Sequence, residues 1–164
     1  MIDEDMCAAA RRVLDACRAQ RLKLALAESC TGGLVAAALT EIAGSSDVFD
    51  RGFVTYSNQA KLTMLGVPAV VLEQNGAVSR ETAEAMARGA LERSGADIAA
   101  AVTGVAGPGG GTAQKPVGLV HFAAGDWSGR LVHRERRYGD LGRAEIRRRS
   151  VLDALSLLEE LASS

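Results

Sequence analysis

The sequence predicts an α/β fold, in which a mixed, mostly parallel sheet of about five strands is covered by helices on both faces. Two observations lead to this fold class. Short apolar runs of strand length alternate with segments whose apolar residues recur at helical spacing. Hydrophobic residues make up 48% of the 164 residues but aromatic residues only 4%, so the core must consist mainly of aliphatic side chains. We expect residues 1–164 to form a single domain.

The first half of the chain alternates helical and strand patterns. Apolar residues recur at helical spacing from Met6 to Cys17, which predicts an opening helix. The elements expected next are a buried strand at 22–27, a helix that begins near Thr31 and stops at Gly44, a strand at 49–56, and a short helix that begins at Ser57 or Asn58 and ends near Gly66. Strands that alternate with helices in this way indicate parallel pairing.

The second half adds a central strand and a hairpin. We expect residues 70–76 to form a loop and Ser79 to cap a helix that Gly95 closes. The remaining elements expected are a nearly all-apolar strand at 97–102, a glycine-rich loop at 103–112, strands at 117–123 and 130–138 with a turn at 126–129, and a final helix at 143–161. The short turn makes the last two strands antiparallel, so the sheet is mixed.

The charge balance bears on partners. The formal net charge is −1, whereas dedicated nucleic-acid-binding proteins carry an excess of basic residues, so a nucleic-acid partner is not expected. Basic residues do cluster late in the chain, at Arg134, Arg136, Arg137, Arg143, Arg147, Arg148 and Arg149. They either form a solvated helix face and strand edge, or one or two of them hold a phosphate or a carboxylate.

Three features predict a cytoplasmic protein with no membrane partner. No apolar run is long enough to cross a bilayer, and acidic residues at 3–5 stand where a signal peptide would be basic. The three cysteines, Cys7, Cys17 and Cys30, lack the spacing of a disulfide framework. Small domains of this kind are often symmetric oligomers, so we expect a homo-oligomer.

The first of three strand ends that suit chemistry carries Ser29. Ligands of an open α/β sheet bind beyond the carboxyl ends of its strands. Ser29 follows a buried strand and precedes a helix, whose first N–H groups have no partner within the helix. The amides near Thr31, Gly32 and Gly33 are therefore candidate donors to an oxyanion beside a Ser29 nucleophile. The alternative is that Ser29 or Thr31 only caps the helix.

Cys30 offers a second candidate nucleophile. A thiol at a helix N-terminus has a lowered pKa, which favours the reactive thiolate. Adjacent side chains in a strand-to-helix turn point in different directions, so if Ser29 faces the cleft, we expect Cys30 to pack beneath it. Spacing alone leaves both residues open as the nucleophile.

The second strand end supplies a candidate base, Lys61. His121 lies in an apolar strand and His133 in a charged one, and these settings favour structural roles. A desolvated lysine can serve as the base of a Ser–Lys dyad instead. Lys61 follows the strand that carries Tyr56, on a short helix with Asn58. The alternative is an exposed helix lysine with no chemical role.

The third strand end is the glycine-rich loop. Its backbone amides, with Gly104, Gly107, Gly109 and Gly110 allowing close approach, can cradle a phosphate. The loop matches neither the dinucleotide fingerprint nor the P-loop pattern. No cluster of His, Cys, Asp and Glu has zinc-ligand spacing, so we expect no metal and no other cofactor.

These strand ends also carry a family resemblance that covers nearly the whole chain. The stretches that match are 27–33 (AESCTGG), 56–61 (YSNQAK), 76–79 (GAVS), 103–112 (TGVAGPGGGT) and its continuation 115–118 (KPVG). In this order and spacing they resemble the CinA C-terminal domain family, the nicotinamide-nucleotide amidases. The first and last stretches are long and specific.

The resemblance implies both a fold and an activity. The fold is a three-layer α/β/α sandwich, and the reaction is hydrolysis of nicotinamide mononucleotide (NMN) to nicotinic acid mononucleotide and ammonia, within pyridine nucleotide salvage. Ser29 matches the nucleophile, Lys61 the general base, and Tyr56 and Thr103 the supporting polar groups. In some relatives the domain follows a larger N-terminal domain linked to competence. A domain that stands alone resembles the dedicated amidase form.

One region departs from the family pattern. The family often has a Gly-Asp-Arg run after the last strand, whereas this chain has GDLGR at 139–143, followed by Ile146 and Arg147. The extra residues leave the alignment of Arg143 open, so we carry it over only as a candidate ligand contact.

Two rival functions use the same features. A non-catalytic nucleotide-binding or competence-linked regulatory module would bind a phosphate with the same loop and release no ammonia. An interaction protein linked to DNA uptake would use the late arginines, and its DNA binding would depend on salt.

Overall fold

The computed structural model describes residues 1–164 and contains one five-stranded sheet in the order β2-β1-β3-β4-β5. The strands are β1 (Leu24–Glu28), β2 (Phe49–Val54), β3 (Ile98–Gly104), β4 (Leu119–Asp126) and β5 (Leu131–Arg137). β1 pairs in parallel with both β2 and β3, while β3–β4 and β4–β5 are antiparallel. The predicted mixed sheet of about five strands is therefore confirmed.

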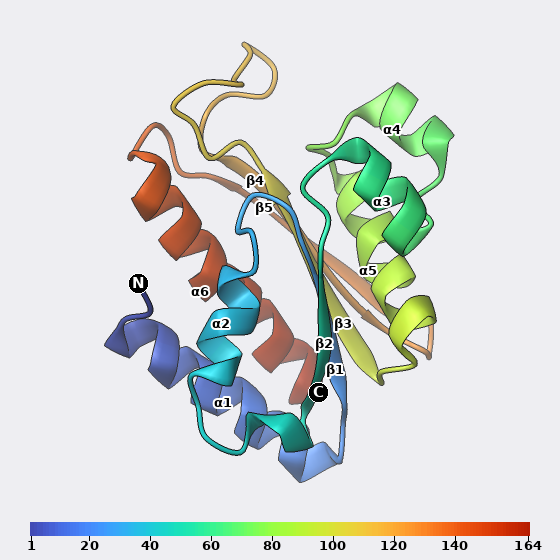
Figure 1. Cartoon of the computed structure of the whole chain (residues 1–164), viewed down its shortest axis with the longest axis vertical. Coiled ribbons are helices and arrows are strands. Elements are labelled where there is room, and N and C mark those ends of the chain that lie inside the picture. The colour runs from blue at the N-terminus through green and yellow to red at the C-terminus, as the bar shows by residue number, and fades with distance from the viewer.

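Helices cover both faces of this sheet (Figure 1). They are α1 (Glu4–Gln20), α2 (Leu34–Thr40), the 3₁₀ helix η1 (Ser45–Asp47), α3 (Asn58–Leu65), α4 (Ala69–Asn75), α5 (Arg80–Ser94) and α6 (Arg143–Ala162). α1, α2 and α6 pack on one face, and α3, α4 and α5 lie on the other. The three-layer arrangement implied by the resemblance is confirmed.

The two faces of the sheet are built from different side chains. In β1, Leu24 and Leu26 join the core under α1, α2 and α6, while Ala25 and Ala27 join the core under α5. Successive side chains of a strand point to opposite faces, so this split follows directly from the sequence. The alanine face lets α5 lie close to the sheet.

One predicted loop is a helix. Residues 70–76 were expected to form a loop, but Ala69–Asn75 is helix α4. Pro68 precedes its first residue with φ −60°, and Gly76 ends it with φ 75°. Only Leu72 of this helix is buried, so its seven residues contain too short an apolar pattern for periodicity to reveal. No helix has the length and hydropathy needed to cross a bilayer.

Candidate active site

The carboxyl ends of the three parallel strands meet at one edge of the sheet. Ser29 directly follows β1, and Tyr56 lies two residues beyond β2. Thr103 is the second-last residue of β3. The first residue of α6, Arg143, lies at the same edge. They border a cleft of about 270 Å³ whose lining residues are Ser29, Cys30, Tyr56, Lys61, Ala77, Val78, Thr103, Gly104, Val105, Ala106, Gly107, Gly109, Gly110 and Arg143.

A serine and a buried amine are in contact inside this cleft. The Lys61 Nζ lies 3.0 Å from the Ser29 Oγ and donates to the Thr55 carbonyl at 2.8 Å. Lys61 is 1% exposed, and burial lowers the pKa of its amine below the ordinary value of 10.5. No carboxylate bonds to the amine, and the effect of burial on its pKa outweighs the opposing effect of Cys30. A neutral Nζ offers the Ser29 hydroxyl a lone pair.

The position of Lys61 is set by the N-terminal cap of helix α3 and by the packing of this helix. The Ser57 hydroxyl accepts the Ala60 N–H, which fixes the start of the helix. Lys61 and Leu65 are four residues apart and both buried, so they share the inner face of α3. The amine is thus held against the sheet rather than in solvent.

The turn after Ser29 differs from the prediction. The helix begins at Leu34, not near Thr31, because Gly32 and Gly33 take positive φ values of 58° and 97° and form a turn first. The Gly32 N–H donates to the Ser29 carbonyl, and the Gly33 N–H donates to Glu28. Two of the three expected oxyanion donors are therefore occupied.

Two backbone N–H groups next to Ser29 are free. The N–H groups of Cys30 and Thr31 donate to no other group of the chain, and Cys30 lines the cleft. Thr31 itself is fully buried, with an Oγ that has no partner. Thr31, Gly32 and Gly33 lie outside the cleft lining, and the two glycines provide the positive φ of the turn.

The structure separates the two candidate nucleophiles. Cys30 is 6% exposed and belongs to the core under α1, α2 and α6. Burial raises the pKa of its thiol to about 12, the opposite of the lowered pKa that a free helix N-terminus would produce. Cys30 is therefore a thiol at neutral pH, while Ser29 has the amine contact.

The mouth of the cleft joins three separate segments. The Arg143 guanidinium donates to the Gly107 carbonyl at 2.8 Å and to the Tyr56 hydroxyl at 3.0 Å. The Thr103 hydroxyl donates to the Ala77 carbonyl at 2.7 Å, which fixes the loop between α4 and α5. Asn58 is exposed at the start of α3 and does not line the cleft.

The lining of the cleft suits an anionic ligand. It contains Arg143 and Lys61 but no Asp or Glu. The N–H groups of Ala106, Gly107, Gly109 and Gly110 donate to no other group of the chain. Free amides in a glycine loop beside an arginine form a suitable environment for a phosphate.

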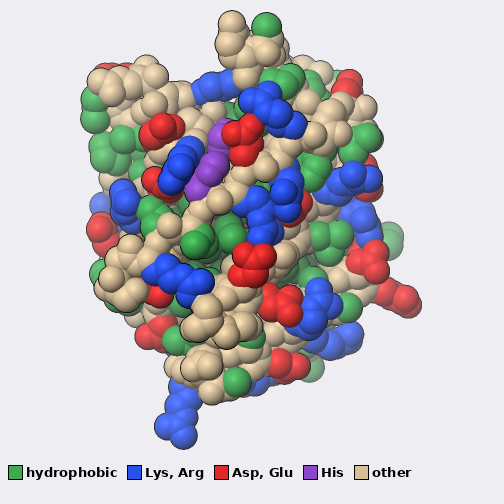
Figure 2. Space-filling model, turned by 180° about the vertical axis from the view of Figure 1, so that it is seen from behind, with side chains coloured by type: hydrophobic (Ala, Val, Ile, Leu, Met, Phe, Trp, Pro, Cys, Tyr) green, Lys and Arg blue, Asp and Glu red, His purple; other side chains and the backbone are tan.

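Most of the late arginines are paired with acids. Figure 2 shows basic and acidic side chains interspersed over the molecule seen from behind. The ion pairs are Arg134 with Asp153 and Glu160, Arg136 with Asp153, Arg137 with Glu135, Arg148 with Asp3 and Asp5, and Arg149 with Glu145. Arg143 and Arg147 instead donate to uncharged oxygens. Of these two, only Arg143 lines the cleft.

Sequence reasoning missed several parts of the site. It assigned no role to Ala77 and Val78, although both lie in the matching stretch 76–79 that could have indicated one. It also missed the Thr55 carbonyl, because a backbone acceptor has no sequence signal. His121 and His133 lie outside the cleft and contact each other, with 2.9 Å between Nδ1 and Nε2.

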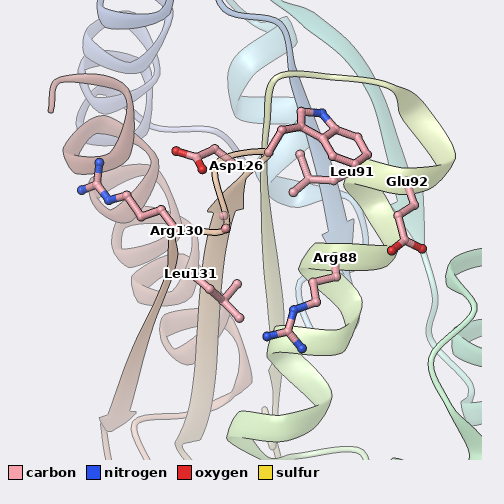
Figure 3. Close-up of a pocket in the computed structure, with 9 residues that line it drawn as sticks. Arg88, Leu91, Glu92, Asp126, Arg130 and Leu131 are labelled. Atoms are coloured by element: carbon pink, nitrogen blue, oxygen red, sulfur yellow. The ribbon is translucent and has the colours of Figure 1, made fainter.

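A second pocket lies at the opposite end of the sheet, beside the turn between β4 and β5 (Figure 3). Its volume is about 210 Å³, and it is lined by Arg88, Leu91, Glu92, Gly125, Asp126, Trp127, Gly129, Arg130 and Leu131. It contains no pair of nucleophile and base, so the cleft at the carboxyl edge is the better candidate for chemistry.

The fold and the cleft define a class of protein: an α/β/α domain with a buried serine–lysine pair beyond the carboxyl ends of its parallel strands. The profile of the CinA C-terminal domain matches residues 7–162, and the chain belongs to that family.

Named relatives agree with this assignment. The chain is 56% identical over 147 residues to a CinA-like protein of Synechococcus sp. (strain RCC307), a match that covers 89% of this chain and 35% of that protein. A crystal structure of a competence/damage inducible protein from Agrobacterium tumefaciens is 56% identical, with a TM-score of 0.96 over 98% of both chains. A CinA superfamily protein from Klebsiella pneumoniae is 36% identical, with a TM-score of 0.91 over 96% of this chain and 98% of that one.

The lengths of these relatives differ. The chain spans about a third or less of the curated proteins that it matches, at 35%, 25% and 24% of three of them. It spans nearly the whole of the solved structures.

Proposed function

We propose that this domain is an amidase that hydrolyses NMN to nicotinic acid mononucleotide and ammonia. The observation that carries the proposal is the 3.0 Å contact between the Ser29 Oγ and the buried Lys61 Nζ. A desolvated amine with a lowered pKa is suited to remove a proton from a hydroxyl at that distance. The family resemblance supplies the substrate, and the acid-free cleft with Arg143 suits its phosphate.

The reaction follows from these positions. The neutral Lys61 takes the Ser29 proton while the Ser29 oxygen attacks the carboxamide carbon. The Cys30 N–H, which adjoins Ser29 and has no backbone acceptor, would donate to the developing oxyanion. The protonated amine then gives its proton to the departing nitrogen, the C–N bond breaks, and ammonia leaves. Lys61 then takes a proton from water, whose oxygen attacks the acyl carbon. The bond to the Ser29 oxygen breaks, Lys61 returns the proton to Ser29, and the carboxylic acid leaves.

The Arg143 contacts explain how substrate would be held. Its guanidinium already bridges Tyr56 and the glycine loop, so a phosphate bound there would sit at the mouth of the cleft. Fixing the distal phosphate orients the ring and its amide toward Ser29. The arginine and the loop amides thus have a positioning role, separate from the chemistry.

The proposal is tested by ammonia release from NMN by the purified chain without added metal. We expect Ser29→Ala and Lys61→Met each to lower kcat by about 10³-fold or more while the fold is retained, because each removes one half of the dyad. Cys30→Ala is the matched control and should retain most of the activity. A wild-type chain that binds NMN but releases no ammonia would show a nucleotide-binding module instead. Loss of activity in Cys30→Ala alone would assign the nucleophile to sulfur.

A further inference from the structure

Glu28 is a buried acid that the proposed reaction does not use. It is 1% exposed, and its carboxylate accepts three backbone N–H groups. Oε2 accepts from Gly33 and from Val35, each at 3.1 Å, and Oε1 accepts from Ala36 at 2.8 Å. N–H groups at the start of a helix have no partner within it, and a buried carboxylate is costly unless it is bonded. The three bonds therefore lock the side chain and the start of α2 together.

Glu28 and Ser29 are consecutive residues that leave the sheet on opposite faces. Leu26 packs in the layer of α2, whereas Ala27 packs in the layer of α5. Side chains alternate along a strand, so the Glu28 side chain lies on the same face of the sheet as Leu26 and points toward α2. The Ser29 side chain lies on the same face as Ala27 and points toward Lys61. The carboxylate thus anchors the turn from behind while the hydroxyl points to the base.

Cys30 is in contact with both the Glu28 side of the sheet and the cleft. Its side chain packs in the layer that contains the Glu28 carboxylate, and it also touches the cleft. Burial raises the pKa of the Cys30 thiol, and the negative charge of Glu28 acts in the same direction. A negative charge in the same layer opposes a second negative charge on the sulfur.

We propose that Glu28 is a positioning residue: its three bonds to the start of α2 fix the turn that carries Ser29, and its carboxylate points into the same core layer as the Cys30 side chain. This inference rests on the proposed amidase function. Glu28 thereby holds the Ser29 hydroxyl, and not the buried Cys30 thiol, toward Lys61.

Two variants of Glu28 distinguish the effect of side-chain length from the effect of charge. Glu28→Gln keeps the length but removes the charge and replaces an acceptor by a donor, so at least one of the three N–H groups loses its partner. Glu28→Asp keeps the charge but is one methylene shorter. Both should lower kcat for ammonia release by about 10- to 100-fold because Ser29 is misplaced, with KM changed by about twofold or less because the residues that hold the substrate are untouched.

The rate of Cys30 alkylation measures the effect of the Glu28 charge independently of enzyme activity. At pH 9, iodoacetamide should modify Cys30 about tenfold faster in Glu28→Gln than in wild type, because loss of the negative charge favours the reactive thiolate. Glu28→Asp should resemble wild type, since its charge remains. Peptide mass analysis distinguishes Cys30 from Cys7 and Cys17. A role limited to folding would not produce this difference between the two variants.

Asp3→Ala is the matched structural control. Asp3 caps α1 by accepting the Met6 N–H at 2.9 Å, and it does not line the cleft. This variant should lose stability without a change in kcat or in Cys30 alkylation. An unchanged kcat in both Glu28 variants, or equal Cys30 alkylation in the two, would overturn the inference. If wild type releases no ammonia, the proposed function fails, and the alkylation rates still decide whether Glu28 controls the thiol.

Discussion

Lys61, the proposed base, is buried at a cost to stability. Its amine is almost completely enclosed, with the Ser29 hydroxyl and the Thr55 carbonyl as its partners. Removal of an ammonium group from water is unfavourable, so the folded chain favours the neutral amine. The same desolvation that suits Lys61 to the proposed role of a base therefore reduces the free energy of unfolding at neutral pH.

Replacement of Lys61 by methionine should stabilise the fold while it abolishes activity. We expect the free energy of unfolding at pH 7 to rise by about 0.5–2 kcal/mol, as is common when an active-site group is replaced. The lowered pKa in the folded state means that the unfolded chain binds more protons between that pKa and 10.5. Wild-type stability therefore rises with pH across this window, and the advantage of Lys61→Met shrinks.

Urea unfolding of both chains between pH 7 and pH 10 measures this effect. The difference between the two curves isolates Lys61 from every other group that titrates in the range. Parallel curves would show that the amine has the same pKa in the folded and unfolded chains and is not a desolvated base.

At the scale of elements, the contact between α3 and α5 sets the position of the base. Gly89 of α5 faces Leu65 of α3, and a Cβ at residue 89 would lie 2.1 Å from the Leu65 carbonyl oxygen. A helical glycine is usually about 1 kcal/mol less favourable than alanine. Here the glycine is required, because only a residue without a Cβ lets the two helices approach so closely.

Gly89→Ala should therefore have the opposite sign to an ordinary glycine-to-alanine change in a helix. We expect a loss of about 1–3 kcal/mol in the free energy of unfolding, the usual cost of overpacking. The displaced α3 carries Lys61, so the rate of ammonia release should fall as well. Denaturant unfolding and kcat measure the two effects, with Glu92→Ala on the exposed face of α5 as the control. A Gly89→Ala chain as stable as wild type would contradict the contact.

At the scale of the whole molecule, the topology explains why chemistry gathers at one edge. Three strands run in parallel, so the residues that follow β1, β2 and β3 meet although they lie far apart in the chain. The antiparallel β4 and β5 then return the chain so that α6 begins at the same edge. Arg143 reaches the cleft by this route.

The two histidines make the stability of the whole domain depend on pH. His121 on β4 and His133 on β5 share a hydrogen bond, and burial lowers the pKa of each below the ordinary 6.5. The unfolded chain then binds more protons than the folded one between those lowered values and 6.5. Stability should be full above pH 6.5 and decline as the pH falls through the lowered values.

Urea unfolding between pH 5 and pH 7.5 measures this decline. The double variant with His121→Gln and His133→Gln should show a flatter dependence on pH, because it retains hydrogen-bonding side chains that do not titrate. Charges that face the pair come from Glu81, Glu84, Glu135, Arg80 and Lys115, and the double variant retains all of them. If the free energy of unfolding of the double variant declined equally steeply, groups other than the two histidines would cause the pH dependence.

The sequence by itself predicted most of the elements and the strand ends that border the candidate cleft. Alternating and helical periodicities are local properties of the chain, so they predicted the five strands, α1, α5 and α6, and the three strand ends that could carry chemistry. The helix α4 was missed because a short segment with one buried residue has almost no periodicity. The family resemblance rested on contiguous motifs and was equally accessible.

The tertiary structure alone decided which groups meet. Ser29 and Lys61 are 32 residues apart, and only the packing of α3 beside the sheet brings their side chains to 3.0 Å. It also decided that Cys30 is buried and that Glu28 occupies the amides at the start of α2. Distances, burial and the pairing of N–H groups depend on segments far apart in the chain, and no local pattern of residues encodes them.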